Sequence, residues 1–218
     1  IEINYLNREN RGLTKTLNEL ITKSSGQYIV IIGSDDYLIN NTIAERVHLL
    51  ENNPSKLMII GDAIVVDENN TTTYESGLFG FHHGNKASYF NASGLKREIV
   101  KNWSIVDPVG MVDRKIYDLI GNYDETLFIE DWDFYLRAVA KDLILFYDAK
   151  VAAYRLHSSN TMNNPAVLIK MWKSGMETAK KNIKHFRFPY NFWLFKKYYR
   201  ARKKYTLLQK EYHANTSH

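Results

Sequence analysis

Two adjacent carboxylates, Asp35 and Asp36, are the first residues in the sequence whose type and position could carry chemistry. They follow the unbroken apolar run 28–32, which is typical of a strand covered on both faces in a parallel sheet. Open α/β sheets bind ligands at the carboxyl ends of strands, where buried carboxylates need a cation or strong hydrogen bonds. Mg²⁺ or Mn²⁺, held also by phosphate oxygens, would suit this pair. The alternative is a plain turn in which Asp36 caps the next helix.

The segment Glu130-Asp131-Trp132-Asp133 places three acidic side chains in four residues, directly before a helical pattern. Acidic residues at this position could simply stabilise the helix N-terminus through its dipole. The functional alternative is a general base whose pKa is raised by the apolar neighbours Phe128 and Trp132. Taken alone, this segment favours neither hypothesis.

The third group is Tyr154-Arg-Leu-His157, which follows the last predicted strand. Arg155 and His157 could contact an anion or a metal ion there, although a single histidine is more often structural or exposed.

The elements that would position these groups alternate between strand and helix. Strands are predicted at 3–5, 28–32 and 57–66, with a hairpin partner for the last at 71–74. Apolar spacing and a plausible Asn41 cap predict helices at 13–24 and 42–52. This order indicates an α/β fold.

The second half of the chain continues the pattern after a long loop, which we expect at 75–94 from its Gly, Asn, Ser and aromatic content. Helices are predicted at 95–102, 115–120 and 132–141, strands at 111–114, 143–147 and 151–154, and further helices at 165–182 and 190–211.

Charge divides the sequence into an acidic body and a basic tail. Residues 170–218 hold 13 Lys and Arg against two acidic residues, whereas the remaining residues are net acidic. There is no Cys, which excludes disulfides and thiolate metal sites. No apolar run approaches the roughly 20 residues of a membrane helix. We therefore divide the chain into a domain at 1–162 and a helical, basic and aromatic extension at 163–218.

In their order and spacing, these features resemble the inverting glycosyltransferases of family 2, which have the GT-A fold. The resemblance covers about residues 1–160 and depends on the three groups above and on Asn10-Arg-Gly12, Asn18, Gly26, Gly110-Met111, Arg114, Gly121-Asn-Tyr-Asp-Glu125 and Arg137. It implies a mixed, mainly parallel sheet flanked by helices.

The resemblance also implies roles for single residues. Asp131 would be the catalytic base, with Glu130 as its substitute. Asp35 and His157 would hold Mn²⁺ or Mg²⁺. The remaining expected site residues are Ser34, Asp36 and Arg155 at the donor diphosphate, and Gly110, Met111 and Trp132 on the acceptor side.

Two departures from the family pattern stand out. Gly33 occupies the position where the family usually has the first Asp of its Asp-x-Asp motif. Family members also begin with strands that hold the nucleotide base, so we expect that roughly 50–70 residues are missing before Ile1. The fragment alone is then expected to bind UDP weakly, to be inactive, and to have its open sheet edge covered by the tail or a second copy.

The expected reaction is metal-dependent transfer of a hexosyl or N-acetylhexosaminyl group, with inversion, from a UDP-sugar to a glycan or lipid-linked acceptor. Bacterial surface polysaccharide or glycoconjugate synthesis in the cytoplasm is the expected setting. An inactive remnant that binds carbohydrate or a partner is the alternative. Nucleic acid is not an expected partner because the body is acidic.

The aromatic and basic segment around 188–205 suits the inner face of an anionic membrane. Packing of these aromatic residues on the body, or in a homodimer, is the alternative.

Overall fold

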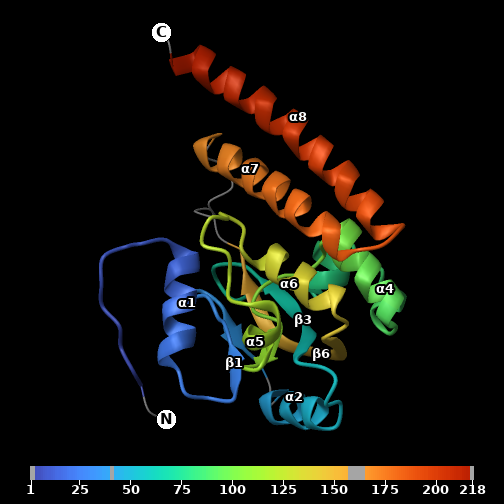
Figure 1. Ribbon diagram of the computed structural model, residues 1–218. Helices are drawn as coiled ribbons and strands as arrows, with labels where there is room; N and C mark the ends of the chain where they lie inside the picture. The colour runs from blue at the N-terminus through green and yellow to red at the C-terminus, as the bar shows by residue number, and fades with distance from the viewer. Residues whose placement is uncertain (1–2, 40–41, 157–164, 217–218) are drawn as a thin grey trace.

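The computed structural model describes residues 3–39, 42–156 and 165–216, and it has one mixed sheet covered by helices (Figure 1). The sheet order is β1-β5-β3-β6-β2, with β4 paired to β3 outside this path. The strands are β1 (Tyr28–Val30), β2 (Tyr37–Leu38), β3 (Met58–Val66), β4 (Thr72–Tyr74), β5 (Gly110–Asp113) and β6 (Ile144–Arg155).

The α/β class is confirmed, but the expectation of a mainly parallel sheet is wrong. Only β3 and β6 run parallel, whereas β1–β5, β3–β5, β2–β6 and β3–β4 are antiparallel. The apolar run at 28–32 predicted a strand covered on both faces in a parallel sheet. Instead, β1 is half-buried and, among the described strands, pairs only with β5. An apolar run reports burial, not the direction of the neighbouring strand.

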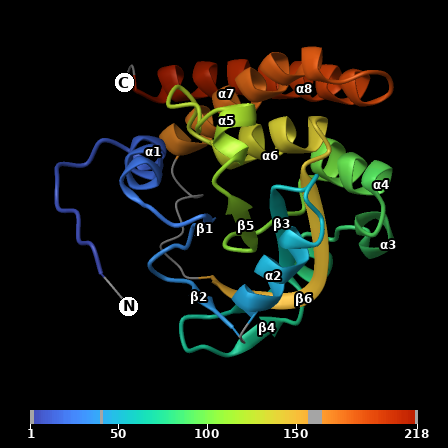
Figure 2. The ribbon, with the colours of Figure 1, turned by 60° about the horizontal axis from the view of Figure 1, so that its bottom comes forward.

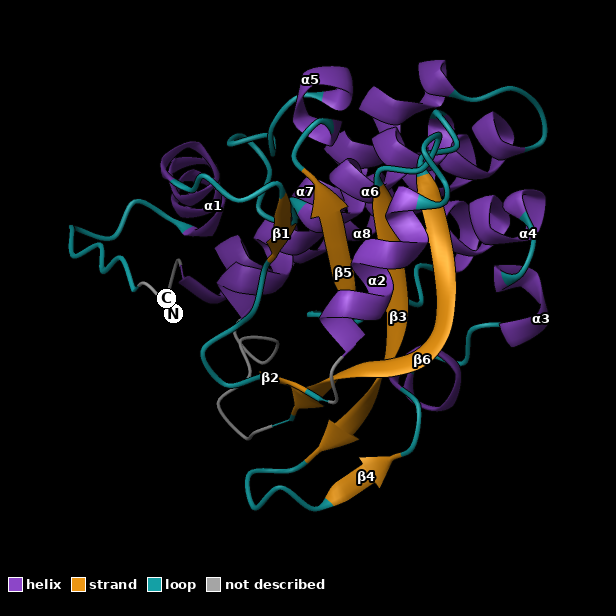
Figure 3. Ribbon diagram, turned by 90° about the horizontal axis from the view of Figure 1, so that it is seen from below, coloured by secondary structure: helices purple, strands orange, loops and turns teal. Residues whose placement is uncertain are grey.

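Strand β6 is longer than the sequence predicts, because the two strands predicted at 143–147 and 151–154 are one. The residues between them remain in the strand. They lie across from β3 where its register with β6 shifts, between Ile60 and Asp62 and between Asp62 and Ala63. Figure 3 shows β6 curving strongly along its length. Its last residues therefore pair with β2, just after the Asp35-Asp36 turn.

Helices α1 (Leu13–Lys23), α2 (Thr42–Glu51), α5 (Ile116–Ile120) and α6 (Asp131–Ala140) confirm the periodic patterns. In α1, Leu17 and Ile21 are buried on one face, as their four-residue spacing predicts. Helix α2 buries Leu50 against Ile59 and Met111 on one face of the sheet. The larger core lies on the other face and includes α6.

Two local predictions are wrong. Residues 3–12 form no strand, and Ile3 and Tyr5 are 85% and 86% exposed. The segment 75–94 is not one loop, since it contains η1 (Gly77–Phe81), α3 (Lys86–Tyr89) and the start of α4 (Ala92–Arg97), which η2 (Glu98–Asn102) continues. Such short turns are built on local caps, as where the Asn91 side chain accepts from Gly94 N–H, and are too short for a period.

The C-terminal residues form a helical hairpin of α7 (Pro165–Asn182), η4 (Ile183–His185) and α8 (Tyr190–Thr216). The hairpin lies over α6 on the side away from α2 (Figure 2). Tyr190, Trp193 and Tyr198 are partly buried and pack against the main core, as the packing alternative expects for part of the segment. Among the described helices, none has a stretch long and apolar enough to cross a bilayer.

Candidate active site

A small cavity of about 50 Å³ lies between β1, β5 and the start of α6, and we call it the acidic cleft. Apolar side chains of α1, β1 and β3 form its floor, including Leu17, Ile29 and Met58. Its polar lining consists of three carboxylates and three phenols, namely Asp107, Glu130, Asp131, Tyr117, Tyr123 and Tyr135. Carboxylates in such partly desolvated surroundings hold protons more tightly than in water.

Glu130 and Asp131 lie at the N-terminus of α6, and both line the cleft. Desolvation is the main cause that raises the pKa of Asp131 well above its usual range, and the charges of Asp107 and Glu130 add to it. Burial likewise raises the pKa of Glu130, with Asp107 adding to the shift. One Asp131 oxygen accepts a hydrogen bond from Trp132 N–H at 2.6 Å, so the carboxylate is fixed at the helix start.

Asp107 is a cleft residue that the sequence analysis missed. The residue is exposed overall, but desolvation of its carboxyl group within the cleft lining raises the pKa of that group. Its charge raises the pKa of Asp131 on one side and of Asp36 on the other. Asp107 is therefore close to both predicted groups, although it precedes a strand instead of following one.

The Asp35-Asp36 turn is held from β6. Asp36 accepts a hydrogen bond from Arg155 N–H at 2.9 Å, and Arg155 Nε donates to the Asp35 carbonyl at 2.8 Å. The remaining guanidinium nitrogens of Arg155 donate to Asp67 O and to Asn70 Oδ1. Arg155 thus joins the Asp35-Asp36 turn to the turn between β3 and β4. Burial first, then the charges of Asp35 and Asp107, raise the pKa of Asp36 to about 6.

Gly33 brings the two turn carboxylates together. A Cβ at this position would lie 2.8 Å from Asp35 Oδ1 and 3.2 Å from Asp36 Oδ2. A side chain here would therefore displace the Asp35 carboxylate, so the glycine and the present arrangement depend on each other. Ser34 is exposed in the same turn.

Two carboxylate oxygens near one point fit the mode in which Mn²⁺ or Mg²⁺ binds through one or two carboxylates and completes its shell with phosphate. Within the described residues, no group of three or more His, Asp or Glu side chains could hold a metal alone. His157, the other predicted metal ligand, lies outside the described residues.

The three predicted acceptor-side residues do not face one cavity. Gly110 lines the cleft, and a Cβ there would lie 2.8 Å from the Tyr135 hydroxyl, so the glycine makes room for Tyr135. Met111 is the next residue of β5 and packs on the opposite face of the sheet. Trp132 is buried on the far side of Asp131 and donates its indole N–H to Ile99 O at 3.0 Å.

The loop that leads into Glu130 is fixed by α1 and α6. Asn18 of α1 donates to Tyr123 O at 2.9 Å and accepts from Tyr123 N–H at 3.1 Å. Arg137 of α6 donates to the carbonyls of Ile120, Gly121 and Asn122. The residues that carry the family resemblance at 18, 121–125 and 137 therefore position the loop.

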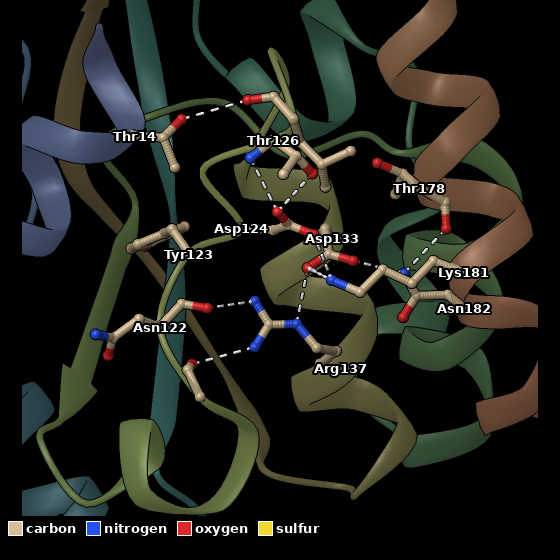
Figure 4. A network of polar contacts seen from close by, with 12 residues as sticks. Thr14, Asn122, Tyr123, Asp124, Thr126, Asp133, Arg137, Thr178, Lys181 and Asn182 are labelled. Carbon is tan, nitrogen blue, oxygen red and sulfur yellow. Dashed lines mark hydrogen bonds and ion pairs between the residues drawn. The ribbon is translucent and has the colours of Figure 1, made fainter. Parts of the chain in front are cut away.

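The helical hairpin fixes the same loop from the other side. Ser174 of α7 accepts hydrogen bonds from Phe128 N–H and Ile129 N–H at 3.0 and 2.8 Å. Asp133, which is fully buried, accepts from Arg137 at 2.8 Å and from Asn182 at 2.7 Å. Figure 4 shows Arg137 and Lys181 converging on Asp133 from opposite sides. The start of α6 is therefore anchored by the C-terminal helices.

A curated relative from Methanocaldococcus jannaschii, described as an uncharacterized glycosyltransferase, is 25% identical over 190 residues. The match covers 86% of this chain, and the chain spans only 62% of that protein's length.

Two solved structures share the fold. The crystal structure of S. aureus TarS 1–349 matches with a TM-score of 0.59 and 13% identity, over 89% of this chain and 52% of its own. The mannosyltransferase PcManGT from Pyrobaculum calidifontis, in complex with GDP-Man and Mn²⁺, matches with a TM-score of 0.52 and 14% identity. That match covers 94% of this chain and 56% of the PcManGT chain. At these identities the likeness shows the fold alone, an α/β fold of the GT-A type.

The family model described as glycosyl transferase family 2 matches residues 1–119, which is more than half of the chain. This match takes in α1, the Asp35-Asp36 turn, Asp107 and Gly110. The resemblance in the sequence is thereby confirmed at the level of the family, and the chain belongs to glycosyl transferase family 2.

Proposed function

We propose that this domain transfers a sugar, with inversion, from a nucleotide-diphosphate donor to an acceptor hydroxyl. The supporting observation is that the charge of Asp107 acts on both Asp36 and Asp131. This common neighbour supports a donor diphosphate at the turn after β1 and an acceptor hydroxyl at the N-terminus of α6, on either side of Asp107. A UDP-sugar is the donor we infer, and a glycan or lipid-linked molecule the acceptor.

Asp131 is the base in this proposal. The acceptor oxygen forms a bond to the anomeric carbon while the bond from that carbon to the diphosphate oxygen breaks. The hydroxyl proton passes to an Asp131 oxygen, and the electron pair of the broken bond leaves with the diphosphate. A carboxylate with a raised pKa is a stronger base once ionised, so the desolvation of Asp131 favours this role. Glu130 lies beside it and is the substitute base.

Asp35 and Asp36 would hold the metal ion, with Ser34 beside the diphosphate and Arg155 fixing the turn. A bound Mn²⁺ or Mg²⁺ would neutralise charge on the leaving diphosphate. The Mn²⁺ and GDP-Man in the PcManGT complex support this choice. His157 is proposed as a further ligand on the resemblance alone.

The test is a transfer assay with a panel of nucleotide sugars and Mn²⁺, with Asp131→Asn as the key variant. We expect turnover to fall by about 10²–10⁴-fold while donor binding by calorimetry is retained. Asp118→Asn, on the exposed face of α5, is the matched control. Unchanged turnover in Asp131→Asn would refute the assignment, and donor binding without any turnover by the wild-type protein would favour the binding-module alternative.

Helix α8 supports a peripheral contact with the inner face of an anionic membrane. On α8, Phe192, Phe195 and Tyr199 are 44%, 46% and 50% exposed and follow helical spacing, and Phe188, just before the helix, is 78% exposed. Lys196, Arg200 and Lys203 are exposed near them. Such a face inserts aromatic rings at the interface while each basic residue contributes about 1 kcal/mol near anionic lipid.

Sedimentation with vesicles that contain phosphatidylglycerol tests this contact, with pure phosphatidylcholine vesicles as control. We expect Phe192→Ser/Phe195→Ser to lose binding. A dimer in solution that this double variant makes monomeric would instead assign the face to a second copy of the chain.

A further inference from the structure

A second cavity of about 370 Å³ lies behind the acidic cleft, between α6 and the helical hairpin. We call it the tryptophan groove, since three of its walls are Trp103, Trp132 and Trp172. Ile129 and Trp132 line it, whereas Glu130 and Asp131 line the cleft. Residues 129–132 therefore separate the two cavities.

The groove lining suits an apolar ligand better than a sugar. Sugar hydroxyls need several hydrogen-bond partners, and Lys197 is the only charged residue in this lining. The Trp132 indole N–H already donates to Ile99 O. Met171 and the tryptophan rings, by contrast, offer the flexible and flat apolar surfaces on which a hydrocarbon chain packs.

Lys197 places a positive charge at this apolar wall. Its ammonium lies 4.9 Å from the centre of the Trp132 ring. Burial, and to a lesser degree Arg200, lowers the pKa of Lys197, because an ammonium next to apolar groups and a second cation is poorly compensated. In the part of the chain that the structure describes, no ion pair joins Lys197 to an acidic side chain. An anionic group on the ligand would supply that compensation.

We propose that the tryptophan groove binds a lipid phosphate, with its hydrocarbon chain along the three tryptophans and its phosphate at Lys197. This inference goes beyond the proposed function and does not depend on it, because the 129–132 segment lies between the groove and Asp131. Binding itself needs neither donor nor turnover, so it can be measured separately.

The probe is decyl phosphate below its micelle concentration, titrated by calorimetry into the full chain without nucleotide sugar. We expect saturable binding, weaker binding of the uncharged decyl maltoside, and none of inorganic phosphate. Lys197→Gln should weaken decyl phosphate about tenfold, as expected for loss of one charged hydrogen bond, and leave decyl maltoside unchanged. Lys180→Gln is the matched control, because Lys180 is exposed on α7 and does not line the groove.

Gly175 offers a way to fill the groove without disturbing the fold. It lines the groove within α7, and a Cβ added there meets no atom within 4 Å. Gly175→Leu should therefore fold as well as the wild type and lose at least about tenfold in affinity for decyl phosphate. Gly175→Ala should keep most of the affinity.

Wild-type affinity in folded Gly175→Leu, or equal affinities for decyl phosphate and decyl maltoside, would overturn the proposal. If decyl phosphate binds as expected while the transfer assay fails, only the proposed transferase function is at fault.

Discussion

The acidic cleft and the tryptophan groove differ in chemistry although one short segment separates them. The cleft gathers Asp107, Glu130 and Asp131, whose pKa values are all raised, whereas the groove has one cation among tryptophans. Successive residues at the start of α6 point in different directions, about 100° apart. Asp131 and Trp132 therefore belong to different sites although they are neighbours in sequence.

The two regions also depend differently on the rest of the chain. The cleft lies between strands within the span of the family match and the start of α6. The groove needs α7 and α8, which lie beyond that match. We infer that the strand walls of the cleft are common to the family, whereas the groove and its ligand depend on this hairpin. Four predictions test this division, beginning with the largest effect.

Asp133→Asn should damage both regions at once. Asp133 is fully buried, and Arg137, Lys181 and Asn182 converge on it, so neutralising it leaves buried donors without their anion. The free energy of unfolding in urea should fall by about 3–5 kcal/mol. Asp118→Asn, at an exposed position, should change it by less than about 0.5 kcal/mol. If Asp133→Asn matches that control, the hairpin and the α6 start are not coupled through this residue.

The pH dependence of stability should report on the Asp35-Asp36 turn and not on the groove. Because the folded pKa of Asp36 is raised from 3.8 to about 6, its protonated form stabilises the fold fully below pH 4. That contribution is lost as the pH rises through 6, and because Asp36 is half-buried, solvent screening reduces it to about 1–2 kcal/mol. The Asp36→Asn variant has no carboxyl group to ionise and should not lose this contribution. The difference in unfolding free energy between the wild type and this variant should therefore change by the same amount between pH 4 and pH 7. A constant difference would contradict the raised pKa.

Asp107→Asn should shift the pH profile of the reaction without affecting the groove. Removing this charge lowers the pKa of Asp131 and of Asp36, since Asp107 raises both. The acidic limb of kcat/KM should move down by up to about 1 pH unit. Decyl phosphate affinity serves as the control and should stay at the wild-type value. An unmoved limb would show that Asp107 is not coupled to the base.

Two glycine substitutions compare the regions most finely. Gly175→Ala adds a methyl group in open space within a helix and should raise the unfolding free energy by about 0.5–1 kcal/mol. Gly110→Ala places its methyl group 2.8 Å from the Tyr135 hydroxyl and should lower that energy by about 1–3 kcal/mol. Urea unfolding of both variants measures the contrast. If both substitutions changed the unfolding free energy in the same direction, one of the two regions would be packed differently from this description.

Much of the fold follows from the sequence, and the errors have physical causes. Helices such as α1 and α6 were predictable because one apolar face repeats over several turns. Strand direction was not, because antiparallel and parallel neighbours can bury the same apolar run. The break predicted near Asp148 was also wrong, since a register shift in β3 accommodates a bend that keeps β6 continuous.

The candidate site shows the same limits. The family motifs led to Asp35, Asp36, Glu130 and Asp131, and those roles stay predictions. Alternation along β5 could have separated Gly110 from Met111, because neighbouring strand residues face opposite sides. Asp107 had no local signal, because its importance comes only from the charges that the fold brings near it. The 1–162 and 163–218 division also stays a prediction, and its boundary lies outside the described residues.

The hydrogen bonds of Ser174 have a consequence for the order of events during synthesis. Phe128 N–H and Ile129 N–H, just before Glu130, find their acceptor in a helix made some 45 residues later. When the sheet and α6 have left the ribosome but α7 has not, the nascent chain still lacks this acceptor and the contact of Asn182 with Asp133. Asp131, the proposed base, therefore reaches its final position only after the hairpin has emerged and docked. Assembly of the cleft is in this way timed to the emergence of α7 from the ribosome.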